Sequence, residues 1–383
     1  MALSDEDRMM AEAAARIADD HLAPNADALD RQAIGSRETL LANLKRLAEN
    51  GFMALNVPAE YGGTEAGTTA FSLVIDQLAR RCASTAVTVS VTNMVGEVIA
   101  SVGSEEQKQT HLPRLADGTY PAGAFCLTES AAGSDPAGMK TRARMDGNEW
   151  VLNGSKIYIT SGEYAGLFVV WAVTDPDAPK GKGISCFLVE AGTPGMTIGK
   201  AEEKLGQHGS ATNIVHFDEC RLPADALLGT ENAGFKVAVS ELAGGRIGVA
   251  ALAHGIGRAA TDAAKAYIKE REQFGQPIAA MQGPQWMVAD TETELEAARL
   301  LIANAAELKD AGAPFARAAS MAKLYASEAA NRACYTALQL HGGAGYTKDY
   351  PVERYARDAR ITTIYEGTSE VQRMIIAREV LAA

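Results

Sequence analysis

The sequence predicts an α+β protein with a helical N-terminal domain, a central antiparallel β domain and a C-terminal helical bundle. Apolar residues recur at helical spacing in the first and last parts of the 383-residue chain. Between them, from about Tyr120, short runs rich in Val, Ile, Phe and Tyr alternate with turn signals. We expect domains at 1–118, 119–230 and 231–383, and the central one has a usual domain size.

The N-terminal domain opens with Ser4-Asp5-Glu6-Asp7, a pattern similar to a capping box at a helix start. The stretch from Ala66 to Val102 is rich in Ala, Ser and Thr and apolar on several faces, so we expect it to be buried between other helices. Between these two segments, a third predicted helix ends at Asn50-Gly51. Its leucines recur at helical spacing, namely Leu40, Leu41, Leu44 and Leu47.

The central domain contains five predicted strands. Asp146-Gly147 and Asn153-Gly154 are typical hairpin-turn dipeptides, and the charged segment from Asp175 to Lys182 is a predicted loop. The strands are expected at Glu149–Leu152, Lys156–Thr160, Leu167–Val173, Ile184–Val189 and Ile214–Phe217.

The C-terminal domain returns to long, alanine-rich helical segments from about Gly234. One helix ends at Gly312 and Pro314, and another runs from Pro314 to about Leu340. Gly255-Ile256-Gly257 superficially resembles a dinucleotide fingerprint, but no strand precedes it, so close helix packing is the better interpretation. The helix that ends at Gly312 and Pro314 has an apolar stripe formed by Leu295, Ala298, Ile302, Ala305 and Leu308.

The composition of the chain limits the classes of partner and the cellular compartment that we expect. A formal net charge of −12 and a pI near 5.1 argue against nucleic acid or an anionic membrane as a partner, which leaves small molecules or proteins. The five cysteines have no metal spacing and an odd count, so a reducing cytoplasm is expected. The N-terminus lacks a basic region followed by an apolar core, and we expect no apolar stretch of membrane length.

Metal and hydrolytic chemistry are weakly supported. The six histidines lack H-x-x-x-H spacing, and no serine lies in a G-x-S-x-G turn. No metal is therefore expected.

The most informative segment is Ile364-Tyr365-Glu366-Gly367-Thr368-Ser369-Glu370, which delivers a carboxylate into a glycine turn at a helix start. A free glutamate has a pKa near ~4.3, whereas a base at neutral pH works best when burial raises that value to roughly 6 or 7. Glu366 is therefore a candidate general base, and a solvated loop glutamate is the alternative. Ser369 and Gln372 resemble a second capping box, which makes Glu370 a first-turn carboxylate.

Two strand ends in the central domain present small polar residues. The segment from Phe125 to Asp135 enters a loop of backbone N–H groups and hydroxyls, which suits a flat heterocycle or a phosphate. The segment from Lys156 to Gly162 ends in hydroxyls beside Tyr158. Each of them, taken singly, is also typical of an ordinary strand end.

Two further segments interrupt the C-terminal helices. The run from Arg271 to Pro277, followed by Gln282, carries an exposed aromatic residue and an arginine that could pair with a phosphate or form a surface ion pair. The run from Gln339 to Tyr346 has too many glycines for a helix interior, so we expect a loop of close approach.

These segments, in this order, resemble the acyl-CoA dehydrogenase family across essentially the whole chain. Gly245-Arg246-Ile247-Gly248 and the run from Arg357 to Ile361 are similar to its short-chain and branched-chain members. The resemblance implies a C-terminal four-helix bundle, a homotetramer built from dimers, and FAD bound between the β domain and the bundle.

The resemblance also implies the contacts of the site. Residues that would touch the flavin or cover its other side are Phe125, Leu127, Thr128, Tyr158, Ile159 and Thr160. Residues that would hold the ADP portion, partly across a subunit interface, are Arg271, Phe274, Gln282, Gln339, Gly342 and Gly343. Two further residues that would contact FAD are Thr368 and Glu370. The CoA thioester would be contacted by Ser134, Arg246 and Gly367, and Ser134 would contact FAD as well.

Glu366 occupies the position of the family's catalytic glutamate. The implied reaction is α,β-dehydrogenation of an acyl-CoA thioester to a trans-2-enoyl-CoA, in which Glu366 removes the α-proton and the flavin accepts the β-hydrogen as hydride. Electrons would then pass to an electron-transferring flavoprotein. In the family, the backbone N–H at this position and a ribityl hydroxyl polarise the thioester carbonyl.

Two departures from the family bear on the substrate. Glu129-Ser130-Ala131-Ala132 lacks the proline that relatives usually place after the glutamate, which predicts a looser loop, and Ala243 occupies a position that is often aspartate. Two other functions stay open, an acyl-CoA oxidase that uses oxygen and a non-redox acyl-CoA-binding protein. Acyl-chain length and branching depend on pocket walls, for which the candidates are Phe71, Val95, Ile99 and Tyr365.

Overall fold

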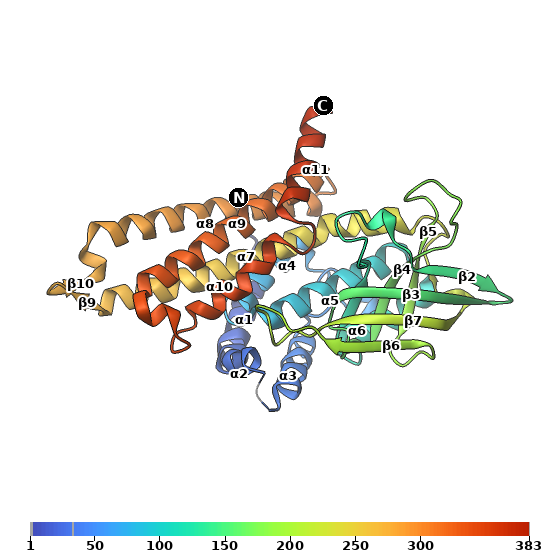
Figure 1. Ribbon diagram of the computed structural model, residues 1–383, viewed down its shortest axis with the longest axis horizontal. Coiled ribbons are helices and arrows are strands. Elements are labelled where there is room, and N and C mark those ends of the chain that lie inside the picture. Colours follow the sequence, from blue (N-terminus) through green and yellow to red (C-terminus); the bar gives the residue numbers. More distant parts are fainter. Residues whose placement is uncertain (1–2, 33, 383) are drawn as a thin grey trace.

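The computed structural model describes residues 3–32 and 34–382. Figure 1 shows the long C-terminal helices at one end of the molecule, the β-sheet at the other and the N-terminal helices between them. The predicted order of helices, sheet and helices is confirmed.

Six α-helices precede the sheet in the described part of the chain, and the predicted first capping box is present because Ser4 accepts a hydrogen bond from the Asp7 N–H. The leucine stripe buries Leu40, Leu44 and Leu47, as expected. The helices are α1 (Asp5–Ile17), α2 (Ala26–Asp30), α3 (Ser36–Glu49), α4 (Gly67–Ala79), α5 (Ala83–Val102) and α6 (Glu105–Ala116).

Helix α5 corrects one expectation. It is long and apolar enough to cross a membrane, although we expected no such stretch. However, 78% of its apolar window is buried inside the protein, where α5 packs against α4, α7 (Gly234–Glu270) and β1 (Gly123–Cys126). Its burial identifies α5 as a core helix of this fold.

The eight strands of the main sheet run in the order β6-β7-β3-β2-β4-β5-β8, with β1 paired to β4. Most pairs are antiparallel as predicted, but β1 and β2 both run parallel to β4, so the sheet is mixed. The bounds are β1 (Gly123–Cys126), β2 (Arg142–Asp146), β3 (Glu149–Thr160), β4 (Leu167–Val173), β5 (Ile184–Glu190), β6 (Met196–Ala201), β7 (Thr212–Pro223) and β8 (Leu227–Leu228).

The predicted turn at Asn153-Gly154 is wrong, because both residues lie inside β3. The pairing of β3 with β7 shifts register between Leu152 and Gly154, and this bulge lets one 12-residue strand continue where we expected two. Strands β2 and β6 were missed because their side chains are largely exposed or half-buried and therefore lack an apolar run.

The C-terminal domain contains the helices α7, α8, α9 and α10, which pack as a bundle, and α11, which extends away from it (Figure 1). A Cβ atom at Gly255 of α7 would lie 2.4 Å from the Asp76 carbonyl oxygen, and one at Gly257 would lie 2.9 Å from Leu295. Close helix packing therefore explains both glycines. The bounds are α7 (Gly234–Glu270), β9 (Glu272–Gln273), β10 (Gln276–Pro277), α8 (Gln282–Asp310), α9 (Ala316–His341), α10 (Val352–Arg360) and α11 (Ser369–Leu381).

Helix α5 joins the sheet to the bundle. A Cβ atom at Gly123 of β1 would lie 2.8 Å from Val95, and a Cβ atom at Gly245 of α7 would lie 2.7 Å from Met94. Neighbouring residues of α5 therefore touch β1 and the middle of α7. The domain boundaries themselves stay predictions.

Candidate active site

Glu366 lies in a strained turn between α10 and α11. Its φ of 54° and the φ of 90° at Gly367 both lie in the left-handed region, which is uncommon for a residue with a side chain. The turn leads into the Thr368 N-cap of α11, whose hydroxyl accepts the N–H of Val371 at 3.3 Å.

The second predicted capping box is wrong, because Thr368 is the cap. Ser369 instead donates to the Glu328 carboxylate at 2.7 Å. The amide nitrogen of Gln372 donates to the carbonyl oxygens of Glu366 at 3.2 Å and Gly367 at 2.9 Å. Glu370 is an exposed first-turn carboxylate, as expected.

The Glu366 carboxyl group faces α7. A Cβ atom at Gly245 would lie 3.4 Å from its Oε2 atom, which is buried and has no hydrogen-bond partner among the described residues. Burial raises the pKa of Glu366 to about 7, although the charges of Arg246 and Lys323 oppose that shift. A carboxyl group with this pKa suits a general base at neutral pH, and a solvated loop glutamate does not fit the geometry.

Two buried cations accompany Glu366. Arg246 of α7 is 7% exposed, and its Nη1 atom lies 3.5 Å from the Ser320 hydroxyl, whereas its Nε atom has no partner among the described residues. Lys323 of α9 is fully buried and donates to the Gly367 carbonyl oxygen at 2.7 Å. Sequence reasoning identified Arg246 but missed Lys323, for which the available signal was a lysine on the apolar face of an alanine-rich helix.

The two strand-end loops of the β domain lie side by side. The Ile157 N–H donates to the Thr128 carbonyl at 2.9 Å. Beneath them, the buried Lys156 ammonium donates to the Leu127 carbonyl at 3.2 Å and to Glu129 Oε1 at 2.7 Å. The structure therefore joins the loop after β1 to the end of β3.

Glu129 holds its loop closed. Its carboxylate accepts the N–H groups of Lys140 at 2.6 Å and Thr141 at 3.0 Å, and its backbone exchanges two hydrogen bonds with Ala132. Although burial alone would raise the pKa of Glu129, the charge and hydrogen bond of Lys156 hold it below its usual value. The loop is thus anchored by Glu129, and its looseness relative to the family stays a prediction.

The side chains predicted to touch the flavin differ in exposure. Tyr158 is 63% exposed with a φ of 57°, Thr128 and Thr160 are half-buried, and Phe125 packs on Trp171 with ring centroids 4.3 Å apart. The side chains of Leu127 and Ile159 are buried in the cores and can offer only backbone atoms to a ligand, and Ser134 is exposed.

The segments predicted to hold the ADP portion lie around the β9–β10 hairpin, at the end of the bundle far from the β-sheet (Figure 1). Phe274, at the tip of the β9–β10 hairpin, is 93% exposed, and a Cβ atom at Gly342 or Gly343 would meet open space. The stacked rings of Tyr267 and His341, with centroids 4.3 Å apart, tie the two segments together. Arg271, Gln282 and Gln339 are also exposed here.

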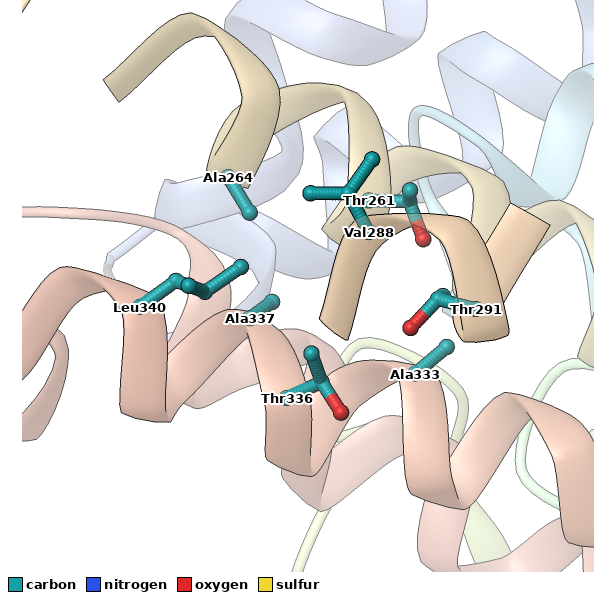
Figure 2. Close-up of a pocket in the computed structure, with 8 residues that line it drawn as sticks. All are labelled: Thr261, Ala264, Val288, Thr291, Ala333, Thr336, Ala337 and Leu340. Atoms are coloured by element: carbon teal, nitrogen blue, oxygen red, sulfur yellow. The ribbon is translucent and has the colours of Figure 1, made fainter. Parts of the chain in front are cut away.

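Within one chain, Glu366, Gly367 and Arg246 therefore lie together. The two strand-end loops form a second group, and the residues predicted to hold the ADP portion lie apart from both groups. The small cavity in Figure 2 belongs to none of these groups. It lies among α7, α8 and α9 and is lined by Thr261, Ala264, Val288, Thr291, Ala333, Thr336, Ala337 and Leu340. Within the described part of the chain, no group of three or more His, Cys, Asp or Glu residues could hold a metal ion.

Three family models match consecutive parts of the chain. They describe the N-terminal, middle and C-terminal domains of acyl-CoA dehydrogenases and match residues 4–119, 124–220 and 232–381. This chain belongs to the acyl-CoA dehydrogenase family. Its members are oxidoreductases, and so is this chain.

Curated relatives agree with the short-chain and branched-chain resemblance. The chain is 46% identical over 382 residues to an acryloyl-CoA reductase (NADH) of Anaerotignum propionicum, covering 99% of this chain and 95% of that protein. It is 44% identical over 379 residues to the mitochondrial short/branched chain specific acyl-CoA dehydrogenase of Rattus norvegicus, covering 98% and 86%.

Solved structures agree with the fold. A chain from a study of the electron-transferring flavoprotein of Acidaminococcus fermentans, concerned with flavin-based electron bifurcation, matches with a TM-score of 0.97 and 43% identity over 100% of both chains. Butyryl-CoA dehydrogenase of Megasphaera elsdenii matches with a TM-score of 0.95 and 38% identity over 100% of this chain and 99% of that one.

FAD is the cofactor of this family and of this chain. A glutaryl-CoA dehydrogenase of Mycobacterium smegmatis in complex with FADH2 matches with a TM-score of 0.91 and 33% identity over 100% of this chain and 96% of that one. The residues present fit such a group, because Thr128 and Thr160 supply hydroxyls beside an exposed aromatic ring and the glycine pair leaves open backbone. The individual contacts stay predictions.

Proposed function

We propose that this chain catalyses the α,β-dehydrogenation of a short or branched acyl-CoA thioester, with Glu366 as the base. The observation that carries the proposal is the buried, unpaired Oε2 atom of Glu366, whose pKa is about 7. The names of the relatives support the choice of a short or branched acyl chain.

In this reaction the Cα–H and Cβ–H bonds break and a C=C bond forms. The α-proton goes to Glu366 Oε2, and the chemistry that FAD would supply when bound is acceptance of the β-hydrogen as hydride with its electron pair. The Glu366 N–H donates no hydrogen bond within the described residues, so it is available to the thioester carbonyl oxygen, where negative charge develops. Lys323 and Gln372 hold the turn that carries both groups.

Mixing the protein with acyl-CoA under anaerobic conditions tests the reaction. Purified protein should be yellow, and a panel of acyl-CoAs of varied length and branching should bleach the flavin while enoyl-CoA accumulates. The short and branched members should bleach it fastest. Colourless protein that binds acyl-CoA without forming product would support the non-redox alternative instead.

We propose an electron-transferring flavoprotein as the physiological electron acceptor, in line with the study in which the similar Acidaminococcus fermentans chain appears. Reoxidation of the bleached enzyme should be fast with that flavoprotein and slow with oxygen. Stoichiometric peroxide release would support the oxidase alternative. Because one relative is named an acryloyl-CoA reductase (NADH), the reduction of an enoyl-CoA with NADH as the electron donor is a second candidate, which the loss of NADH absorbance on addition of enoyl-CoA would reveal.

We also propose that the chain forms a homotetramer in the cytoplasm, where its five buried cysteines stay unpaired. Large apolar side chains are exposed on the C-terminal helical domain and its hairpin, which is unusual for a surface that faces only water. They include Phe274, Trp286, Tyr335, Tyr346 and Met374. A neighbouring copy would cover this surface and bring its own Arg271 segment or glycine loop to the FAD, and sedimentation velocity checks the assembly.

A further inference from the structure

Lys323 is buried without a carboxylate partner. It is 0% exposed, and among the described residues its ammonium group forms no ion pair. Its contact is the neutral carbonyl oxygen of Gly367, 2.7 Å away. Removing a lysine charge from water without pairing it costs several kcal/mol, so stability alone does not account for this residue.

A purely structural role as a link between α9 and α11 is already filled by other residues. Gln372 donates to the same Gly367 oxygen at 2.9 Å, and Ser369 of α11 donates to Glu328 of α9 at 2.7 Å. The feature that Lys323 adds to these contacts is its positive charge, placed directly behind the turn that carries Glu366.

The charged groups around Lys323 come from three elements. Arg246 lies on α7, Glu328 on α9 itself, and Glu366 and Glu370 in the turn and the first turn of α11. Burial lowers the pKa of Lys323 to about 8, whereas the negative charge of Glu366 acts in the opposite direction. Lys323 is therefore charged below about pH 8 and Glu366 is ionised above about pH 7, so both charges are present between these values.

We propose that Lys323 is a positioning residue, which fixes the Glu366-Gly367 turn through the Gly367 carbonyl and places a positive charge beside that turn in favour of the Glu366 carboxylate. This inference rests on the proposed role of Glu366 as the base. Arg246, on α7, also favours the ionised form of Glu366. Among the described residues, Lys323 is the cation that donates a hydrogen bond to the turn itself.

Substitutions at Lys323 separate its charge from its hydrogen bond. Lys323→Gln keeps a donor near the Gly367 oxygen but removes the charge, Lys323→Met removes both, and Lys323→Arg keeps the charge. Loss of a nearby opposite charge shifts a carboxyl pKa by about one unit or more. We therefore expect the pH midpoint of anaerobic flavin reduction to rise by about one unit in the Gln and Met variants, with reduction ~5-fold slower at pH 7.

The Arg variant should keep the wild-type midpoint, as should Lys200→Gln, which removes an exposed charge in β6. A second readout needs no turnover. Infrared difference spectra of the apoprotein, titrated with acid, should show the Glu366 carboxyl band at the same shifted midpoint, and Glu366→Gln identifies that band by its loss.

Gln and Met variants with wild-type midpoints in both readouts would overturn the proposal, even if those variants were less stable. A different result would sink the proposed base itself: full flavin bleaching by Glu366→Gln protein. The two failures are thus distinguishable.

Discussion

The buried ion pair of Lys156 and Glu129 should stabilise the loop that follows β1, which is predicted to contact the flavin. The Lys156→Met variant leaves the Glu129 carboxylate buried with only the N–H groups of Lys140 and Thr141, and it leaves the Leu127 carbonyl without its donor. Breaking a buried ion pair by removing one partner costs about 3–5 kcal/mol. Because two N–H bonds to Glu129 remain, we expect about 3 kcal/mol, at the lower end of that range.

Urea unfolding of the Lys156→Met protein measures this loss, and FAD titration of the variant should show weaker binding because the Leu127-Thr128 segment is released. Lys200→Met is the matched control, since Lys200 and Glu203 form an exposed pair that should contribute less than about 1 kcal/mol. The double variant with Glu129→Gln should recover part of the stability, because no unpaired charge stays buried. If Lys156→Met unfolds at the same urea concentration as Lys200→Met, the buried pair does not support the loop.

Three further predictions concern the Glu366 turn. Because the base must be ionised, anaerobic flavin reduction should accelerate as pH rises through about 7, which is the pKa of Glu366. A rate that stays the same from roughly one pH unit below this value to roughly one unit above it would contradict this assignment. Gly245→Ala places a methyl group 3.4 Å from Glu366 Oε2 and 2.7 Å from Met94, so stopped-flow reduction should slow at least about tenfold, whereas Gly283→Ala, which meets open space, should leave the rate unchanged. Thr368→Ala removes the N-cap of α11 and should lower the free energy of unfolding by about 1 kcal/mol in urea titrations; an unchanged value would show that the cap is not needed.

The sequence predicted the fold well where local signals and tertiary packing agree. The leucine stripe of α3 and the glycines of α7 both follow from burial, so their pattern was readable. Strand β3 was divided wrongly because Asn153-Gly154 is a good turn dipeptide, and only the pairing with β7 shows that the strand continues through a bulge. The parallel pairing of β1 and β2 with β4 has no local sequence signal at all.

The site was predictable to a similar extent. The motif around Glu366 identified the carboxylate, but not the burial of its Oε2 atom, because Gly245, the α7 residue next to that atom, is distant in sequence. Lys323 and Lys156 were missed as supports because a lysine in a sequence is usually a surface charge, and only the folded structure shows that both are fully buried. Serine favours the N-cap position, so the sequence predicts Ser369 as the cap, yet Thr368, one residue earlier, occupies it.

The most direct test of the central claim is anaerobic mixing of the Glu366→Gln protein with an acyl-CoA that bleaches the wild-type flavin. The substitution keeps the shape of the side chain and removes the base, so the variant should bind FAD as the wild type does, and its flavin absorbance should stay unchanged after substrate is added. Bleaching of the variant flavin at the wild-type rate would contradict the claim that Glu366 removes the α-proton.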